Sequence, residues 1–251
     1  MRVPIIAGNW KMHKTGREAA ELARQIVQRL GDERGVEVVL CPPFTALAAV
    51  AKAIEGSGVK LGAQNVHWEG EGAFTGEISP RMLLETGCAY VIVGHSERRT
   101  YFGESDEMVN KRARAALANG LNPIICVGET LEQRRAGTTV EVVTGQVRRA
   151  LEGISRDEIE RVVLAYEPLW AVGSDLPATP GDADEVAGFI RKTVSGLYDA
   201  AAGDRIRIQY GGCVKPDNIG GFMQVENIDG ALVGGASLDA ESFAAIVQYD
   251  R

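Results

Sequence analysis

Eight short runs of apolar residues, many of them β-branched, alternate with longer amphipathic segments along the whole chain. Several runs are apolar at nearly every position, which is typical of parallel strands covered on both faces. In the segments between them, apolar residues recur at intervals of three and four, which predicts amphipathic helices. The predicted strands are 3–7, 36–41, 59–63, 89–93, 123–127, 162–165, 205–209 and 230–233. The clearest predicted helices are 17–30, 105–119, 140–151 and 182–201.

No linker rich in Pro, Gly or Ser and no block of like charges divides the 251 residues, so the sequence predicts one domain over residues 1–251. Eight parallel strands can close into a barrel, which leaves no unpaired edge. A doubly wound open sheet normally carries a GxGxxG turn after its first strand, whereas residues 8–11 read GNWK. The pattern therefore favours the α/β class, as a single (β/α)8 barrel with an outer ring of helices.

The composition argues against several classes of protein. With 27 basic and 34 acidic residues the net charge is −7, which argues against a nucleic-acid-binding surface. No apolar run approaches the roughly 18–20 residues of a membrane-spanning helix, and the N-terminus lacks a signal-peptide core, so we expect a cytoplasmic protein without membrane contacts. The cysteines form no CxxC pair, which argues against a zinc ribbon or dithiol site; they are Cys41, Cys88, Cys126 and Cys213.

The active site of a barrel lies at the carboxyl ends of its strands, so the residues after each run are the candidates. Asn9 and Lys11 follow the first predicted strand. His95 follows the fourth, at the start of a predicted short helix whose N-terminus disfavours the imidazolium form. Glu167 follows the sixth and is held by the next residue, Pro168, which makes it a candidate general base.

Paired glycines at 211–212 and 234–235 follow the seventh and eighth predicted strands. The loops after these strands are the recurrent phosphate site of barrels, because backbone N–H groups beside glycine can approach an anion. The sequence has no cluster of histidines and carboxylates with metal-ligand spacing. Together the candidates favour metal-free proton transfer on a small phosphorylated carbonyl compound, in which the lysine stabilises an enolate oxygen and the histidine and glutamate move protons.

These residues stand in motifs that resemble the triosephosphate isomerase family along essentially the whole chain. In order they are GNWKM at 8–12, GAFTGEIS at 72–79, VGHSERR at 93–99, CVGET at 126–130, AYEPLWAVG at 165–173, YGGCV at 210–214 and GALVGGASL at 230–238. The resemblance implies interconversion of dihydroxyacetone phosphate and D-glyceraldehyde 3-phosphate through an enediolate, without a cofactor, in glycolysis and gluconeogenesis.

The resemblance assigns Glu167 as the base and His95 as the neutral electrophile and proton shuttle. Asn9 and Lys11 would contact the substrate, and Glu97 would support Lys11. Backbone N–H groups would hold the phosphate, from Gly173, Cys213, Gly234 and Gly235. A lid would close over the site and exclude water. Its residues are Pro168, Leu169, Trp170, Ala171, Val172, Ser174, Asp175, Leu176, Pro177 and Ala178, together with the phosphate-binding Gly173.

The resemblance also implies a homodimer in which the loop after the third predicted strand reaches into the partner subunit. Phe74, Thr75 and Gly76 lie in this loop, and Thr75 would approach the partner's Asn9 and the partner's Lys11. An apolar Phe74 on a long loop also has a physical need for a partner surface.

Three positions depart from the family pattern. His13 stands where asparagine is frequent, and we expect little effect because it lies beyond Lys11. Cys213 replaces a usual serine with a weak S–H donor near the phosphate, and we expect backbone N–H groups to compensate. Residues 173–178 read GSDLPA instead of the frequent GTGKTA, and Pro177 is expected to stiffen the lid.

Three other interpretations use the same barrel. A glycosidase could use Glu97 and Glu167 as its carboxylate pair, but aromatic residues for stacking sugars are only 6% and the glycine pairs would have no role. A Schiff-base aldolase could use Lys11, and borohydride trapping would detect it. A metabolite-binding or purely structural barrel would explain the fold, but not the joint presence of Asn9, Lys11, His95 and Glu167.

Overall fold

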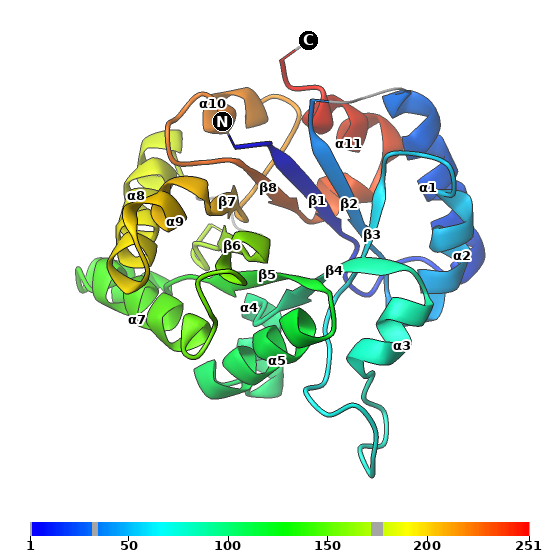
Figure 1. The fold of residues 1–251 in the computed structure, drawn as a ribbon. Coiled ribbons are helices and arrows are strands. Elements are labelled where there is room, and N and C mark those ends of the chain that lie inside the picture. The colour runs from blue at the N-terminus through cyan, green and yellow to red at the C-terminus, as the bar shows by residue number, and fades with distance from the viewer. Residues whose placement is uncertain (1, 32–34, 172–177, 251) are drawn as a thin grey trace.

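The computed structural model of the chain describes residues 2–31, 35–171 and 178–250. Within these residues, eight parallel strands form a closed barrel in which each strand pairs with its neighbours in sequence and β8 pairs with β1 (Figure 1). This arrangement confirms the predicted (β/α)8 barrel. The strands are β1 Ile5–Asn9, β2 Glu37–Cys41, β3 Lys60–Ala63, β4 Cys88–Val93, β5 Asn122–Val127, β6 Val163–Tyr166, β7 Arg207–Tyr210 and β8 Gly230–Val233.

Helices lie around the outside of the barrel (Figure 1). The α-helices of the described residues are α1 Gly16–Leu30, α2 Leu47–Ala53, α3 Pro80–Glu85, α4 Ser96–Phe102, α5 Asp106–Ala118, α6 Leu131–Arg135, α7 Thr139–Leu151, α8 Pro180–Leu197, α9 Ala200–Arg205, α10 Ile219–Met223 and α11 Ala240–Val247. Short 3-10 helices are η1 Phe44–Ala46, η2 Ile159–Arg161 and η3 Gly235–Leu238. In the part of the chain described, none of the helices is long and apolar enough to cross a membrane.

Burial on both faces explains why the strands are apolar at consecutive positions. Ile5 and Ala7 of β1 belong to a core cluster made by strand residues, at the centre of the barrel. Ile6, between them, belongs to the larger cluster between barrel and helices, which includes Leu22 and Ile26 of α1. Successive side chains of a strand point to opposite faces, so a strand with a barrel interior on one face and helices on the other is apolar throughout.

The structure corrects three predicted boundaries. β1 begins at Ile5 rather than at residue 3, because Val3 is 55% exposed and Pro4 has no backbone N–H to donate to a ladder. The predicted helix 182–201 is instead two helices, because the Asp199 side chain accepts a hydrogen bond from the N–H of Ala202 and starts α9. Since α9 continues to residue 205, β7 begins at Arg207.

Candidate active site

The carboxyl ends of the strands surround a pocket of about 480 Å³. The predicted site residues that line it come from the ends of β1, β4, β6, β7 and β8, which are far apart in sequence and adjacent in the closed barrel. They are Asn9, Lys11, His95, Glu167, Cys213, Gly234 and Gly235. This is the end of a barrel at which active sites are built.

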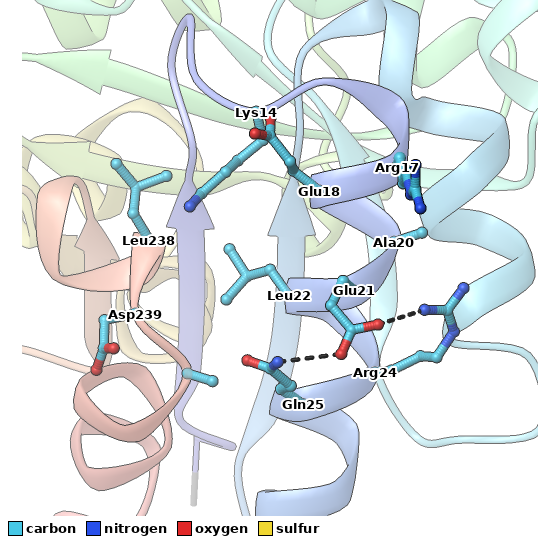
Figure 2. Close-up of a pocket in the computed structure, with 11 residues that line it drawn as sticks. Lys14, Arg17, Glu18, Ala20, Glu21, Leu22, Arg24, Gln25, Leu238 and Asp239 are labelled. Carbon is cyan, nitrogen blue, oxygen red and sulfur yellow. Dashed lines mark hydrogen bonds and ion pairs between the residues drawn. The ribbon is translucent and has the colours of Figure 1, made fainter.

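A larger hollow, about 660 Å³, lies on the outer surface between α1 and the start of α11 (Figure 2). Several of its charged groups already have partners within the chain. Glu21 accepts hydrogen bonds from Arg24 at 2.8 Å and from Gln25 at 3.1 Å, and Asp239 caps α11. None of the predicted site residues lines this hollow, so its size does not make it the candidate active site.

Glu167 directly follows β6 and is almost completely buried, with 2% of its surface exposed. Its Oε2 accepts a hydrogen bond from the backbone N–H of Ser96 at 2.9 Å, and its Oε1 lies 2.9 Å from Nε2 of His95. Glycines directly after the neighbouring strands β5 and β7 make room for it. A Cβ atom at Gly211 would lie 2.8 Å from Cγ of Glu167, and one at Gly128 would lie 1.8 Å from its carbonyl oxygen. The carboxylate is therefore held in a closely fitted recess.

The contacts of Glu167 keep it ionised. Burial raises the pKa of this carboxyl group, but the neighbouring His95 and the N–H of Ser96 lower it by more, so the net direction is downward. An ionised carboxylate that is buried and hydrogen-bonded on both oxygens is a base that needs only to be released from these partners.

His95 is the N-cap of α4 and is 6% exposed. Its Nδ1 accepts a hydrogen bond from the backbone N–H of Glu97 at 3.2 Å, which places the proton of a neutral ring on Nε2, facing Glu167. Burial lowers the pKa of His95, but the carboxylates of Glu167 and then Glu97 raise it by more. The sequence expectation considered only the helix N-terminus, and the two carboxylates act in the opposite direction.

Lys11 lines the pocket and has a strained backbone conformation, with φ of 50°. Its Nζ lies 2.7 Å from Oε1 of Glu97, the pairing expected from the resemblance. Its backbone N–H donates to Oδ1 of Asn9 at 3.0 Å, and its carbonyl oxygen accepts from Nε2 of Gln64 at 2.9 Å. Gln64 was missed at the sequence level, because nothing local to residue 64 signals that its amide holds a turn after another strand.

The other end of the pocket is open and lined by backbone. A Cβ atom at Gly235 would meet no atom within 4 Å, and one at Gly234 would meet only Lys11, at 3.5 Å or more. Their N–H groups donate to no other described residue, so they can receive an anion. Cys213 is partly exposed here. Lys215 also lines the pocket, and its Nζ has no partner among the described residues, which adds a cation that the sequence reasoning did not single out.

The predicted lid is described only in part. Pro168, Leu169, Trp170, Ala171 and Ala178 are described, whereas Val172, Gly173, Ser174, Asp175, Leu176 and Pro177 lie outside the described residues. At the first end, the buried carboxylate of Glu129 accepts hydrogen bonds from Nε1 of Trp170 at 2.9 Å and from the hydroxyl of Tyr166 at 3.1 Å. Glu129 is a second residue that sequence reasoning missed, because its partners are far along the chain.

Phe74, Thr75 and Gly76 do not line the pocket of their own chain. They lie in the loop between β3 and α3, which extends beyond the ring of helices (Figure 1). Phe74 is 43% exposed at this site. Among the described residues, no group of three or more His, Cys, Asp or Glu side chains is arranged to hold a metal ion.

Comparisons with known proteins agree with the geometry. The sequence model of the family described as "Triosephosphate isomerase" matches residues 4–250. A triosephosphate isomerase of Caldanaerobacter subterraneus subsp. tengcongensis is 57% identical over 249 residues, which cover 99% of this chain and 100% of that protein. One of Moorella thermoacetica is 57% identical over 251 residues, the full length of both chains. One of Carboxydothermus hydrogenoformans is 56% identical over 248 residues, 99% of each chain.

Proposed function

Because the chain belongs to the triosephosphate isomerase family, it interconverts dihydroxyacetone phosphate and D-glyceraldehyde 3-phosphate, and we propose that Glu167 is the base. The observation that supports this role most is the contact of its ionised, buried carboxylate with Nε2 of His95 at 2.9 Å, inside the pocket that Lys11 also lines. Family membership also makes the glycosidase, aldolase and binding-protein alternatives unnecessary.

The reaction moves one proton between adjacent carbons and one between adjacent oxygens. Glu167 leaves its hydrogen bonds to Ser96 and His95, removes a proton from C1 of dihydroxyacetone phosphate, and leaves an enediolate. Nε2–H of His95 gives its proton to the oxygen on C2, and the ring then takes a proton from the oxygen on C1. Glu167 returns its proton to C2, which regenerates both groups and yields the aldehyde.

Lys11 and Asn9 contact the substrate in this proposal. The ammonium of Lys11 stabilises the negative oxygen of the enediolate, and Glu97 at 2.7 Å holds the ammonium in place. Asn9 fixes the turn that carries Lys11 through its 3.0 Å hydrogen bond to the backbone N–H. No cofactor takes part in any of these steps.

The phosphate binds at the open end of the pocket, on the backbone N–H groups of Cys213, Gly234 and Gly235, with that of Gly173 from the lid. Lys215 at the rim attracts the phosphate dianion to a protein whose net charge is −7. The lid, residues 168–178, closes over the bound substrate so that the enediolate does not lose its phosphate to water.

We further propose that residues 1–251 form one domain that acts as a homodimer in the cytoplasm. Phe74, Thr75 and Gly76 enter the partner, and Thr75 reaches the partner's Lys11. Large apolar side chains elsewhere on the surface fit a dimer, since Met12 is 94% and Phe102 66% exposed. All four cysteines are free, which suits a reducing compartment.

A coupled assay of glyceraldehyde 3-phosphate conversion tests the proposal, with the wild type and Glu167→Asp in the presence of a chelator. We expect wild-type kcat/KM near the diffusional ceiling, on the order of 10⁸ M⁻¹s⁻¹, and a large loss of kcat in the variant. A variant as fast as the wild type would exclude Glu167 as the base. Activity that the chelator abolishes would exclude the metal-free mechanism.

A further inference from the structure

The segment that carries Phe74, Thr75 and Gly76 is an arm, residues 66–78, closed at its base by the backbone. The N–H of His67 donates to the carbonyl oxygen of Ile78 at 2.8 Å, so the two ends of the arm are tied together. The residues between them leave the barrel without helix or strand (Figure 1). An arm of this length needs side-chain contacts to hold its tip in one direction.

An aromatic stack runs from the base of the arm to its tip. The ring of His67 lies between two others, with its centroid 4.3 Å from that of Trp68 and 4.5 Å from that of Phe74. His67 is only 6% exposed, although it stands on a surface loop. Its position between the rings makes it the link between a residue at the base and a residue at the tip.

The base of the stack is fixed to a buried charged group. The guanidinium of Arg112 lies 5.3 Å from the centre of the Trp68 ring and is itself 2% exposed. Arg112 is held by Glu104 at 3.1 Å, by Oδ1 of Asn65 at 3.2 Å and by the carbonyl oxygen of Val66. Trp68 therefore rests on a group that cannot move without breaking a buried ion pair.

The tip of the stack is followed directly by Thr75. The ring of Phe74 also packs on Gly72, where a Cβ atom would approach the ring to 2.9 Å and where φ is 139°, so only glycine fits. The carbonyl oxygen of Phe74 accepts from the N–H of Glu77 at 3.0 Å, which closes the turn around Thr75. Thr75 therefore lies in a turn that begins at the residue whose ring ends the stack.

We propose that His67 is a positioning residue for the neighbouring subunit's active site: its ring holds the arm so that Thr75 reaches the partner's Lys11. The proposal rests on the proposed dimer. His67 also accepts a hydrogen bond at Nδ1 from the N–H of Glu69 at 3.1 Å, which is a second way in which it could order the arm. Two substitutions separate the ring from the acceptor.

His67→Phe keeps a flat ring between Trp68 and Phe74 and removes the acceptor. His67→Asn keeps an acceptor near the position of Nδ1 and removes the ring. We expect His67→Asn to lower kcat/KM by about tenfold and to weaken the dimer, and His67→Phe to keep both within about threefold of the wild type. Phe189→Ala is the matched control, since it removes an aromatic ring that contacts Lys192 on α8, and it should change neither. Equal losses in Phe and Asn variants, or no loss in Asn, would overturn the role of the ring.

Mixing variants separates positioning in trans from local damage. A His67→Asn chain has an intact Glu167 but a misdirected arm, whereas a Glu167→Gln chain has an intact arm but no base. In a mixed dimer the first chain receives the intact arm, so an equal mixture should recover activity at about a quarter of all sites. Activity equal to the mean of the two parents would contradict the inference while leaving the isomerase assignment untouched. A wild type that sediments as a monomer and is active would overturn the proposed dimer and this inference together. A wild type without isomerase activity would contradict the proposed catalysis.

Discussion

The two ends of the active-site pocket are built in opposite ways. At the base end, Glu167 and His95 are buried, and both carboxylate oxygens are engaged with partners of this chain. At the phosphate end, the N–H groups of Gly234 and Gly235 and the ammonium of Lys215 have no partner among the described residues. The base end is satisfied before substrate arrives, whereas the phosphate end is incomplete without an anion.

The two glycine pairs show the same difference. Gly211 and Gly212 look in sequence like a second anion cradle, but a Cβ atom would strike Glu167 at the first and the Tyr210 hydroxyl, 2.1 Å away, at the second. A Cβ atom at Gly235 would meet nothing. Glycine at 211 and 212 leaves room for side chains of the protein itself, whereas glycine at 234 and 235 leaves room for a ligand. The comparison predicts that variants at the base end impair proton transfer, whereas variants at the phosphate end impair phosphate binding.

The largest effect is expected at the base end. Glu167→Gln removes the only carboxylate that contacts Nε2 of His95 among the residues that the structure describes, and kcat should fall by about 10²–10⁴. Because proton transfer does not need the phosphate, turnover of unphosphorylated glyceraldehyde should fall by a similar factor. Steady-state assays with both substrates measure this. A loss confined to the phosphorylated substrate would contradict the division of the pocket.

Adding one methyl group at each end gives a matched pair. Gly211→Ala places a Cβ atom 2.8 Å from Cγ of Glu167, so it should displace the base and impair both substrates. Gly235→Ala adds the methyl group where no atom of the chain lies within 4 Å, so the fold should stay intact. The methyl group should then obstruct only the phosphate group of the substrate. Loss of one hydrogen bond to a charged group, about 1.5–3 kcal/mol, corresponds to about 10–10²-fold in kcat/KM. Equal impairment of glyceraldehyde turnover in both variants would remove the distinction.

The barrel could be predicted from sequence because its signal is repeated in every unit. Apolar runs at consecutive positions indicate strands covered on both faces, and the end of each strand gives the place of the next polar residue. What sequence did not reveal depends on pairs of distant residues. Gln64 holds the turn at Lys11 across 53 positions, and Glu129 binds Trp170 across 41. No local pattern encodes such contacts, since only the closed barrel brings the partners together.

The pKa of His95 at the base end should also depend on the charge of Glu167. Burial lowers the pKa of His95, whereas the anionic Glu167 raises it, so removing that charge in Glu167→Gln should move the pKa of His95 down. NMR titration of the ring in the wild type and the variant measures the direction. The remaining carboxylate, Glu97, raises the pKa in both proteins and serves as the constant reference. An unchanged or higher pKa in the variant would show that the two groups are not coupled.

The smallest activity change is expected from Cys213→Ser at the phosphate end. The backbone N–H of Cys213 is unaffected, and the added hydroxyl meets solvent or phosphate, so KM should change by less than about tenfold, or ~1.4 kcal/mol, and thermal unfolding should not move. The same substitution at Cys126 is the control from the base end, where the side chain is fully buried beside Glu167. In Cys126→Ser the new hydroxyl is buried away from solvent, and we expect the free energy of unfolding to fall by about 1–3 kcal/mol. A larger drop in KM for Cys213→Ser would mean that the backbone alone does not hold the phosphate, and the open end would then depend on side-chain chemistry as the buried end does.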